Sequence, residues 1–298
     1  MAFPLCPKPA FQRISTLLHP TPAGHYIANN LEAVLTRIVL FLFIFSTLSQ
    51  LFSQEKINGM EVLPGTKIKE HVGEVLPVGL PFVADNGQTI RFSQALKGPT
   101  VMNFVYYRCP GICSPLLTSM VKLFNETSLE PGKDFFAVTL SFDETENAQL
   151  AAEKKENYFK MIKREFPRDA WTWLAGEGED IRRITDAAGF EFVASAKDFI
   201  HPAAMYIISK EGRIVRYFSG ITFDPFSFRM AILEASQPES LSMQDKLMLF
   251  LYKYDADLEV YAFNQTAIWG GVALITLILI LSILRSVSAN RKTPASAA

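Results

Sequence analysis

Two long apolar runs stand apart from the mixed polar and apolar pattern of the rest of the chain. The run from Ala267 to Leu284 (AIWGGVALITLILILSIL) contains no charged residue. As a helix it would be roughly 27 Å long, close to the roughly 30 Å hydrocarbon core of a bilayer. Trp269 near one end and Arg285 beyond the other are typical of membrane boundaries. We therefore predict a membrane-spanning helix here rather than a buried helix of a soluble core.

The run from Ile38 to Phe52 is shorter, and polar residues interrupt its second half. This pattern predicts a signal peptide or a short transmembrane segment. The 37 residues before it include five prolines and indicate either a tail or a leader with a misassigned start. Basic residues before this run and after the C-terminal run favour a cytoplasmic location for both ends of the chain, if neither run is cleaved. The segment between the runs would then face the periplasm in a bacterium.

Between the two runs the chain alternates between predicted strands and predicted helices. Thr100–Tyr107 and Asp134–Phe142 are almost continuously apolar, which is typical of strands buried on both faces of a parallel sheet. Leu116, Met120 and Phe124 follow at a spacing of four and predict a helix. The other expected elements are hairpins at 80–96 and 205–218, a strand at 171–174, and helices at 144–165, 179–188 and from 224. This order predicts an α/β sandwich with a mixed central sheet.

Composition and charge narrow the class of protein. The 298 residues are 49% hydrophobic and 20% charged, which excludes a disordered chain. A net charge of -1 argues against a nucleic-acid partner, since such proteins usually carry a basic surplus. We expect six segments: a tail or leader at 1–37, the signal or short membrane segment at 38–54, the α/β domain at 55–235, a membrane-proximal segment at 236–266, a transmembrane helix at 267–285, and a cytoplasmic tail at 286–298.

The chemistry is concentrated at Cys109 and Cys113, two of only three cysteines. If a helix begins near Cys109 or Pro110, the spacing of four places both sulfurs on one face. A helix N-terminus favours the thiolate, and thiolates select copper(I) or zinc over hard cations. The same pair could instead exchange with disulfides or form a structural disulfide. A disulfide that closes so short a loop adds little stability, however. Metal capture and thiol–disulfide exchange therefore both stay open.

Two thiolates leave copper or zinc under-coordinated, so a metal site needs a third ligand. His19 and His25 precede the first apolar run and are expected on the other side of the membrane. His71 and His201 remain. His201 stands just before the strand predicted from residue 205, where a fold of this type returns the chain beside the strand-to-helix turn. His201 is therefore the candidate third ligand.

Several segments together resemble the SCO/SenC family over about residues 63–235. They are FVYYRCPGICSPLL, VTLSFDETEN, WTWLAG, AAGFEF and HPAAMYIISKEGRIVRYFSG. The resemblance implies a thioredoxin-like fold, a membrane tether, and a copper ion, Cu(I) or Cu(II), bound by Cys109, Cys113 and His201. It also implies a role in building the binuclear copper site of cytochrome c oxidase. Asp143 matches an acidic family position, but Glu144 replaces the proline that often follows it, so only a supporting role is expected for Asp143.

The resulting hypothesis is a copper metallochaperone of the C-terminally anchored subgroup. It would lie in the cytoplasmic membrane with its soluble domain in the periplasm, and its partner would be the copper-binding subunit II of cytochrome c oxidase. The alternative is a thiol–disulfide oxidoreductase in which Cys109 attacks and Cys113 resolves, so that the recipient's cysteines are reduced. A peroxidase of the same fold is less favoured, because no obvious polar residues surround the reactive thiolate.

Overall fold

The computed structural model describes residues 68–195 and 198–291, with side chains up to residue 285. All described residues belong to one compact unit. The expected signal or short membrane segment at 38–54 lies outside the described residues, as do Cys6, His19 and His25.

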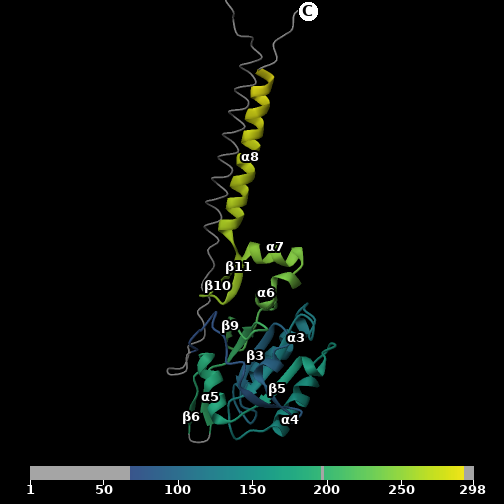
Figure 1. Ribbon diagram of the computed structural model, residues 1–298, viewed down its shortest axis with the longest axis vertical. Coiled ribbons are helices and arrows are strands. Elements are labelled where there is room, and N and C mark those ends of the chain that lie inside the picture. The colour runs from purple at the N-terminus through teal and green to yellow at the C-terminus, as the bar shows by residue number, and fades with distance from the viewer. Residues whose placement is uncertain (1–67, 196–197, 292–298) are drawn as a thin grey trace, which may run out of the picture. The chain divides into compact units, whose positions relative to one another are not determined.

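A seven-stranded mixed sheet forms the centre of the domain (Figure 1). The strand order is β2-β1-β5-β4-β3-β8-β9, with β3, β4 and β5 parallel and every other pair antiparallel. The six residues of β3 are all buried, as their continuous apolar sequence predicts. The predicted mixed α/β fold is confirmed. The strands are β1 (Pro81–Ala84), β2 (Thr89–Arg91), β3 (Thr100–Val105), β4 (Phe136–Ser141), β5 (Trp171–Ala175), β8 (Ala204–Ile208) and β9 (Ile214–Ser219).

Five helices accompany this sheet, and most occupy the stretches that the sequence predicts. They are α2 (Phe92–Ala95), α3 (Cys113–Glu126), α4 (Ala148–Phe159), α5 (Gly178–Ala187) and α6 (Pro225–Ala235), with a short 3-10 turn η1 (Arg168–Ala170) before β5. The helix expected from residue 144 begins later, because the Asp143 carboxylate accepts the N–H of Thr145 and closes a turn first. The Asn147 side chain then caps α4. Gly189, at φ +63°, follows the end of α5 as expected.

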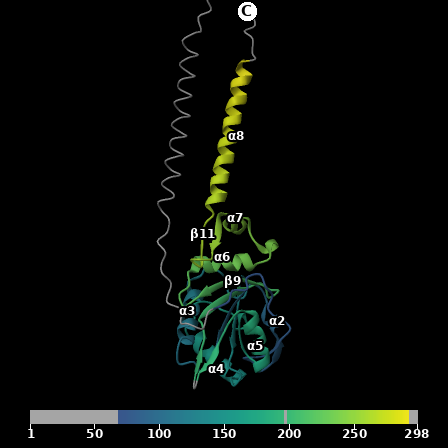
Figure 2. The same ribbon diagram turned by 90° about the vertical axis from the view of Figure 1, so that its left-hand side faces the viewer.

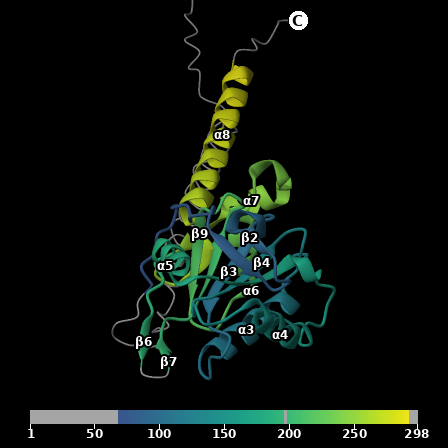
Figure 3. The same cartoon turned by 60° about the horizontal axis from the view of Figure 1, so that its bottom comes forward.

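Aromatic side chains fill both faces of the sheet in two separate groups. Tyr106 and Tyr107 are consecutive residues just after β3, and each contacts a different group. The group with Tyr107 includes residues of α3, α4 and α6, and Figure 3 shows α3 and α4 side by side. The group with Tyr106 contains Phe142 and His201. One of the candidate ligands therefore lies in an aromatic environment.

The chain after α6 continues through a 3-10 turn η2 (Pro238–Ser240), α7 (Met243–Leu251) and a hairpin of β10 (Tyr252–Asp255) and β11 (Val260–Phe263). This hairpin packs on the domain: the Tyr254 hydroxyl donates to the carbonyl of Tyr217, and the Tyr261 N–H donates to the Ser227 hydroxyl. It leads into α8 (Gln265–Arg291), drawn in yellow in Figure 2. Within the described residues, the stretch 265–285 of α8 is the one helix long and apolar enough to cross a membrane, with a mean hydropathy of 2.6.

Candidate metal centre

The loop between β3 and α3 carries both cysteines. The helix begins at Cys113, so the expected start at Cys109 or Pro110 is wrong, and the sulfurs do not share a helix face. Cys109 lies instead in a turn, where its N–H donates to the carbonyl of Tyr106 at 3.2 Å. The N–H of Gly111 donates back to the Cys109 sulfur at 3.3 Å. A tight turn, rather than one turn of helix, brings the two thiols together.

His201 lies beside the two cysteines although it comes from a distant part of the sequence. It follows a small hairpin formed by β6 (Val193–Ser195) and β7 (Asp198–Ile200), and it precedes β8. Its Nε2 atom lies 3.5 Å from the sulfur of Cys113, and its Nδ1 atom lies 2.9 Å from the carbonyl oxygen of Pro202. Because a carbonyl can only accept, Nδ1 carries the proton in the neutral ring. The lone pair of Nε2 is therefore available at the cysteines.

The three candidate ligand atoms form a cluster. The sulfurs of Cys109 and Cys113 and a ring nitrogen of His201 all lie within 4.8 Å of one another. Three atoms this close always leave a point within about 2.8 Å of each of them, near the roughly 2.3 Å of a metal–thiolate bond. Small side-chain movements would thus bring all three atoms to bonding distance. His71, the other eligible histidine, is hydrogen bonded through Nδ1 to the carbonyl of Ala187 and does not belong to the cluster.

The cluster is buried on one side and open on the other. The imidazole of His201 packs edge-on against Phe142, with ring centroids 5.0 Å apart, and Tyr106 and Phe190 are also in contact with it. Cys113 is 2% exposed and Cys109 8% exposed, whereas His201 is half-buried. A ligand group from another molecule could therefore approach from the side of His201.

The two thiols have opposite pKa shifts. A hydrogen bond from the Cys113 thiol lowers the pKa of Cys109 to about 4, and the backbone N–H of Gly111 acts in the same direction. The same hydrogen bond raises the pKa of Cys113, and burial and the carboxylate of Glu146 raise it further. One proton therefore stays on Cys113, while Cys109 is a thiolate at neutral pH. A thiolate is the form that binds metals and attacks disulfides.

Comparison with known families gives one match, over residues 77–234, to the sequence model of the family described as SCO1/SenC. That match covers more than half of the chain. The chain belongs to the SCO1/SenC family. Comparison with curated proteins gives no match.

Solved structures resemble this SCO1/SenC chain at low identity. A candidate electron transfer protein from Aquifex aeolicus VF5 is 24% identical with a TM-score of 0.50, over 55% of this chain and 94% of its own. This likeness supports the fold. Arabidopsis thaliana ScoI with copper bound is 21% identical with a TM-score of 0.43, and the match covers 53% of this chain and 97% of that one. Yeast Sco1 with copper bound is 16% identical with a TM-score of 0.42, and the match covers 59% of this chain and 93% of that one.

Glu146 supports the cysteine loop of this SCO1/SenC domain and was not expected from the sequence. It is 4% exposed, and its carboxylate accepts the N–H groups of Tyr107 and Arg108 and the hydroxyl of Ser141. The sequence places it only within the helix expected at 144–165. Its position just after β4 was the only clue, since parallel strands end at the same edge of a sheet. Asp143 closes its own turn with Thr145 instead.

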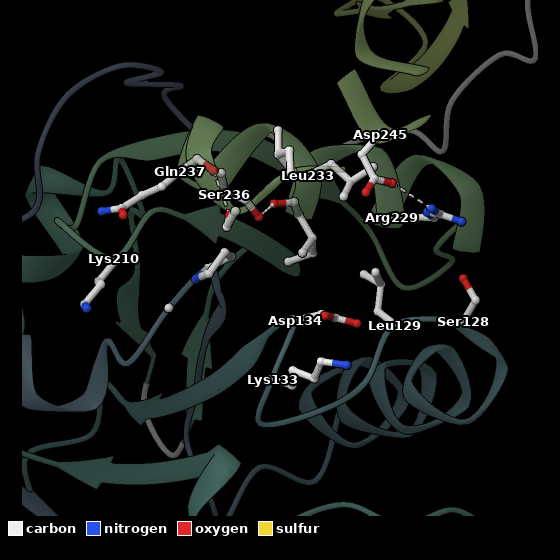
Figure 4. Close-up of a pocket in the computed structure, with 16 residues that line it drawn as sticks. Ser128, Leu129, Lys133, Asp134, Lys210, Arg229, Leu233, Ser236, Gln237 and Asp245 are labelled. Carbon is white, nitrogen blue, oxygen red and sulfur yellow. Dashed lines mark hydrogen bonds and ion pairs between the residues drawn. The ribbon is translucent and has the colours of Figure 1, made fainter. Parts of the chain in front are cut away.

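A cavity of about 470 Å³ lies elsewhere, and no cysteine or histidine lines it (Figure 4). Its wall comes from α6, the loop after α3 and the segment leading to α7. Three of the charged lining side chains are engaged in ion pairs: Arg229 pairs with Asp245 at 2.9 Å, and Lys133 pairs at 2.9 Å with Glu130, which lies outside the lining. The chemistry of the domain is therefore at the cluster of Cys109, Cys113 and His201.

Proposed function

We propose that this protein is a membrane-anchored copper chaperone that binds one copper ion through Cys109, Cys113 and His201. The observation that carries the proposal is the convergence of two sulfurs and one ring nitrogen within 4.8 Å. Membership of the SCO1/SenC family supports it. The copper recorded in two similar structures, from Arabidopsis thaliana and yeast, agrees with this choice of metal.

The donor set suits a metal that is held and then passed on. Two thiolates are soft ligands that favour copper(I), and the imidazole adds a ligand acceptable to copper(I) and copper(II). Three protein ligands leave room for an incoming group, so the ion can move by stepwise ligand exchange. His201 is half-buried and is the most exposed of the three residues, so such a group would arrive from its side.

We further propose that the recipient is the copper-binding subunit II of cytochrome c oxidase and that delivery takes place in the periplasm. The support for this recipient is the family resemblance. The support for a membrane tether is the apolar stretch 265–285 of α8. In the proposed domain organisation, residues 55–235 form the copper-binding domain and residues 236–266 the membrane-proximal segment. Residues 267–285 form the transmembrane helix and residues 286–298 a cytoplasmic tail.

Elemental analysis of the purified full chain tests the proposal. The chain is reduced, loaded anaerobically with copper(I) and desalted, and copper per chain is measured. We expect about one copper per chain, lost in Cys109→Ser and in Cys113→Ser. Cys6→Ser is the matched control and should retain the metal. A wild-type chain that leaves the column without copper, or a Cys109→Ser chain that keeps it, would contradict the proposal.

A thiol–disulfide oxidoreductase is the second candidate, favoured by the low pKa of Cys109 beside a second thiol. The Cys109 thiolate would attack one sulfur of a recipient's disulfide and release the other as a thiolate. Cys113 would then attack the mixed disulfide, so the recipient leaves with two thiols and a Cys109–Cys113 disulfide forms. Incubation with an oxidised dithiol peptide tests this: the wild type should reduce it, and Cys113→Ala should accumulate the mixed disulfide. An unchanged peptide excludes the activity.

A further inference from the structure

The short helix α7 presents a stripe of large apolar side chains to its surroundings. Met243 is 80% exposed, Leu247 55% and Phe250 60%. Their spacing of four and then three residues places all three on one face of the helix. An exposed stripe of this kind indicates a surface that something else covers.

The opposite face of α7 is attached to the domain, so the exposed stripe cannot turn inward. Asp245 pairs with Arg229 of α6 at 2.9 Å, a contact drawn in Figure 4. Met248 and Leu249 pack against the hydrophobic core. The Ser242 side chain accepts the N–H of Asp245 and caps the helix. The orientation of α7 about its own axis is therefore fixed.

The end of α7 is joined by hydrogen bonds to the start of the candidate membrane helix. The backbone N–H of Asn264 donates to the carbonyl of Leu251 at 2.7 Å. The Asn264 side chain accepts the N–H of Ala267 at 3.2 Å, in the first turn of α8. Phe263, which immediately precedes this junction, is 59% exposed. The apolar stripe is thus continuous with the end of the apolar stretch at 265–285.

We propose that α7 lies in the surface of the lipid bilayer, with Met243, Leu247 and Phe250 inserted at the level of the headgroups. This rests on the membrane tether of the proposed function. A helix that spans a bilayer must end at its surface, so residues bonded to its first turn are held there. A helix with one apolar face is stable in that interface. The tether removes most of the entropic cost of association, so nine residues suffice where a free helix would not.

Such an arrangement would hold the copper-binding domain in one orientation at the membrane. The contact of Arg229 with Asp245 links α7 to α6, and the Tyr254 hydroxyl links the hairpin after α7 to β9. The domain would then not swing freely on α8. Its open metal site would be presented to membrane-bound recipients from a constant height.

Tryptophan quenching in vesicles tests the proposal on the full chain. Phe250→Trp places a fluorophore on the stripe, and Lys122→Trp, at a side chain that is 74% exposed on α3, is the matched control. Each variant is reconstituted into phosphatidylcholine vesicles with and without bromine on the upper acyl chain. We expect the added fluorescence at position 250 to be quenched at least threefold more strongly than that at position 122.

The native Trp269 in α8 separates failure of this proposal from failure of the tether. If bromolipid quenches the wild-type chain but position 250 behaves like position 122, α7 does not lie in the bilayer and the proposal is overturned. A blue-shifted but unquenched signal at position 250 means that a protein surface covers the stripe, which also overturns it. Absence of any quenching in the wild type would contradict the membrane tether itself.

Discussion

The carboxylate of Glu146 accepts the backbone N–H of Tyr107 at 2.5 Å and that of Arg108 at 2.7 Å. This contact joins the loop after β4 to the loop that carries both cysteines. Tyr107 and Arg108 lie just beyond β3, where no strand partner accepts their N–H groups, and Glu146 accepts both. The geometry of the dithiol thus depends on a residue more than thirty positions away.

Replacing Glu146 with Ala should destabilise the domain and loosen the cysteine loop. The buried N–H of Tyr107 and the partly buried N–H of Arg108 lose their acceptor, and the buried group alone costs about 1–3 kcal/mol. Guanidinium unfolding monitored by tryptophan fluorescence measures the loss. Glu153→Ala, at an exposed position of α4, is the control and should change the free energy of unfolding by less than about 0.5 kcal/mol. Equal values for the two variants would show that the carboxylate does not hold the loop.

The low pKa of Cys109 predicts selective and pH-independent alkylation. With a pKa of about 4, Cys109 is fully ionised from pH 6 to pH 8, so its reaction rate with iodoacetamide should be flat over this range. Cys113, with a raised pKa, should react far more slowly. Fragmentation of the tryptic peptide 109–122 by mass spectrometry distinguishes the two sites.

Removal of the hydrogen-bond donor by Cys113→Ala should return the pKa of Cys109 toward its ordinary 9.0. The alkylation rate of Cys109 would then rise about tenfold per pH unit below the new pKa. A rate that stays flat in this variant would mean that another group lowers the pKa.

Loss of the His201 imidazole should weaken the binding of copper(II) more than the binding of copper(I). In His201→Ala the two thiolates can still satisfy copper(I), whereas copper(II) loses a nitrogen ligand that it favours. Competition titrations with chelators selective for each oxidation state give the two affinities. His71→Ala is the matched control, since its ring is hydrogen bonded away from the cluster. Equal copper(II) binding in His201→Ala and the wild type would exclude three-ligand coordination.

A hydrogen bond between the residue after β3 and the first residue of β7 should position His201. The Tyr106 hydroxyl donates to the Asp198 carboxylate, which also accepts the N–H of Phe199. Tyr106→Phe removes this link and should lower copper(II) affinity roughly fivefold while copper(I) binding stays unchanged. Tyr206→Phe is the control, because its hydroxyl has no hydrogen-bond partner within the described part of the chain. An unchanged copper(II) spectrum in Tyr106→Phe would count against a positioning role.

The fold was largely predictable because its central strands have an unambiguous pattern. Thr100–Val105 and Phe136–Ser141 are apolar on both faces, and the glycine after α5 marks the helix end. The start of α3 was mispredicted, since its position depends on the turn at Gly111 and on the carboxylate of Glu146. Interactions between distant residues of this kind leave no local pattern.

Much of the candidate site could also be predicted, because cysteines and histidines are few. The pair at Cys109 and Cys113 and the choice of His201 follow from that scarcity, and the structure brings the three together. The β10–β11 hairpin was not predicted. Its packing depends on single contacts, such as that between Tyr261 and Glu234, rather than on a repeated apolar pattern.

The positions of Cys109, Cys113 and His201 along the chain impose an order on the formation of their cluster. Cys109 and Cys113 leave the ribosome as a pair, but His201 follows 88 residues after Cys113, and α8 comes last. A nascent chain that has emerged only as far as Cys113 offers a dithiol without His201. The complete donor set exists only after β8 has joined the sheet beside β3. Formation of the cluster of Cys109, Cys113 and His201 is thereby coupled to completion of the fold, and a chain that stops before β8 cannot assemble it.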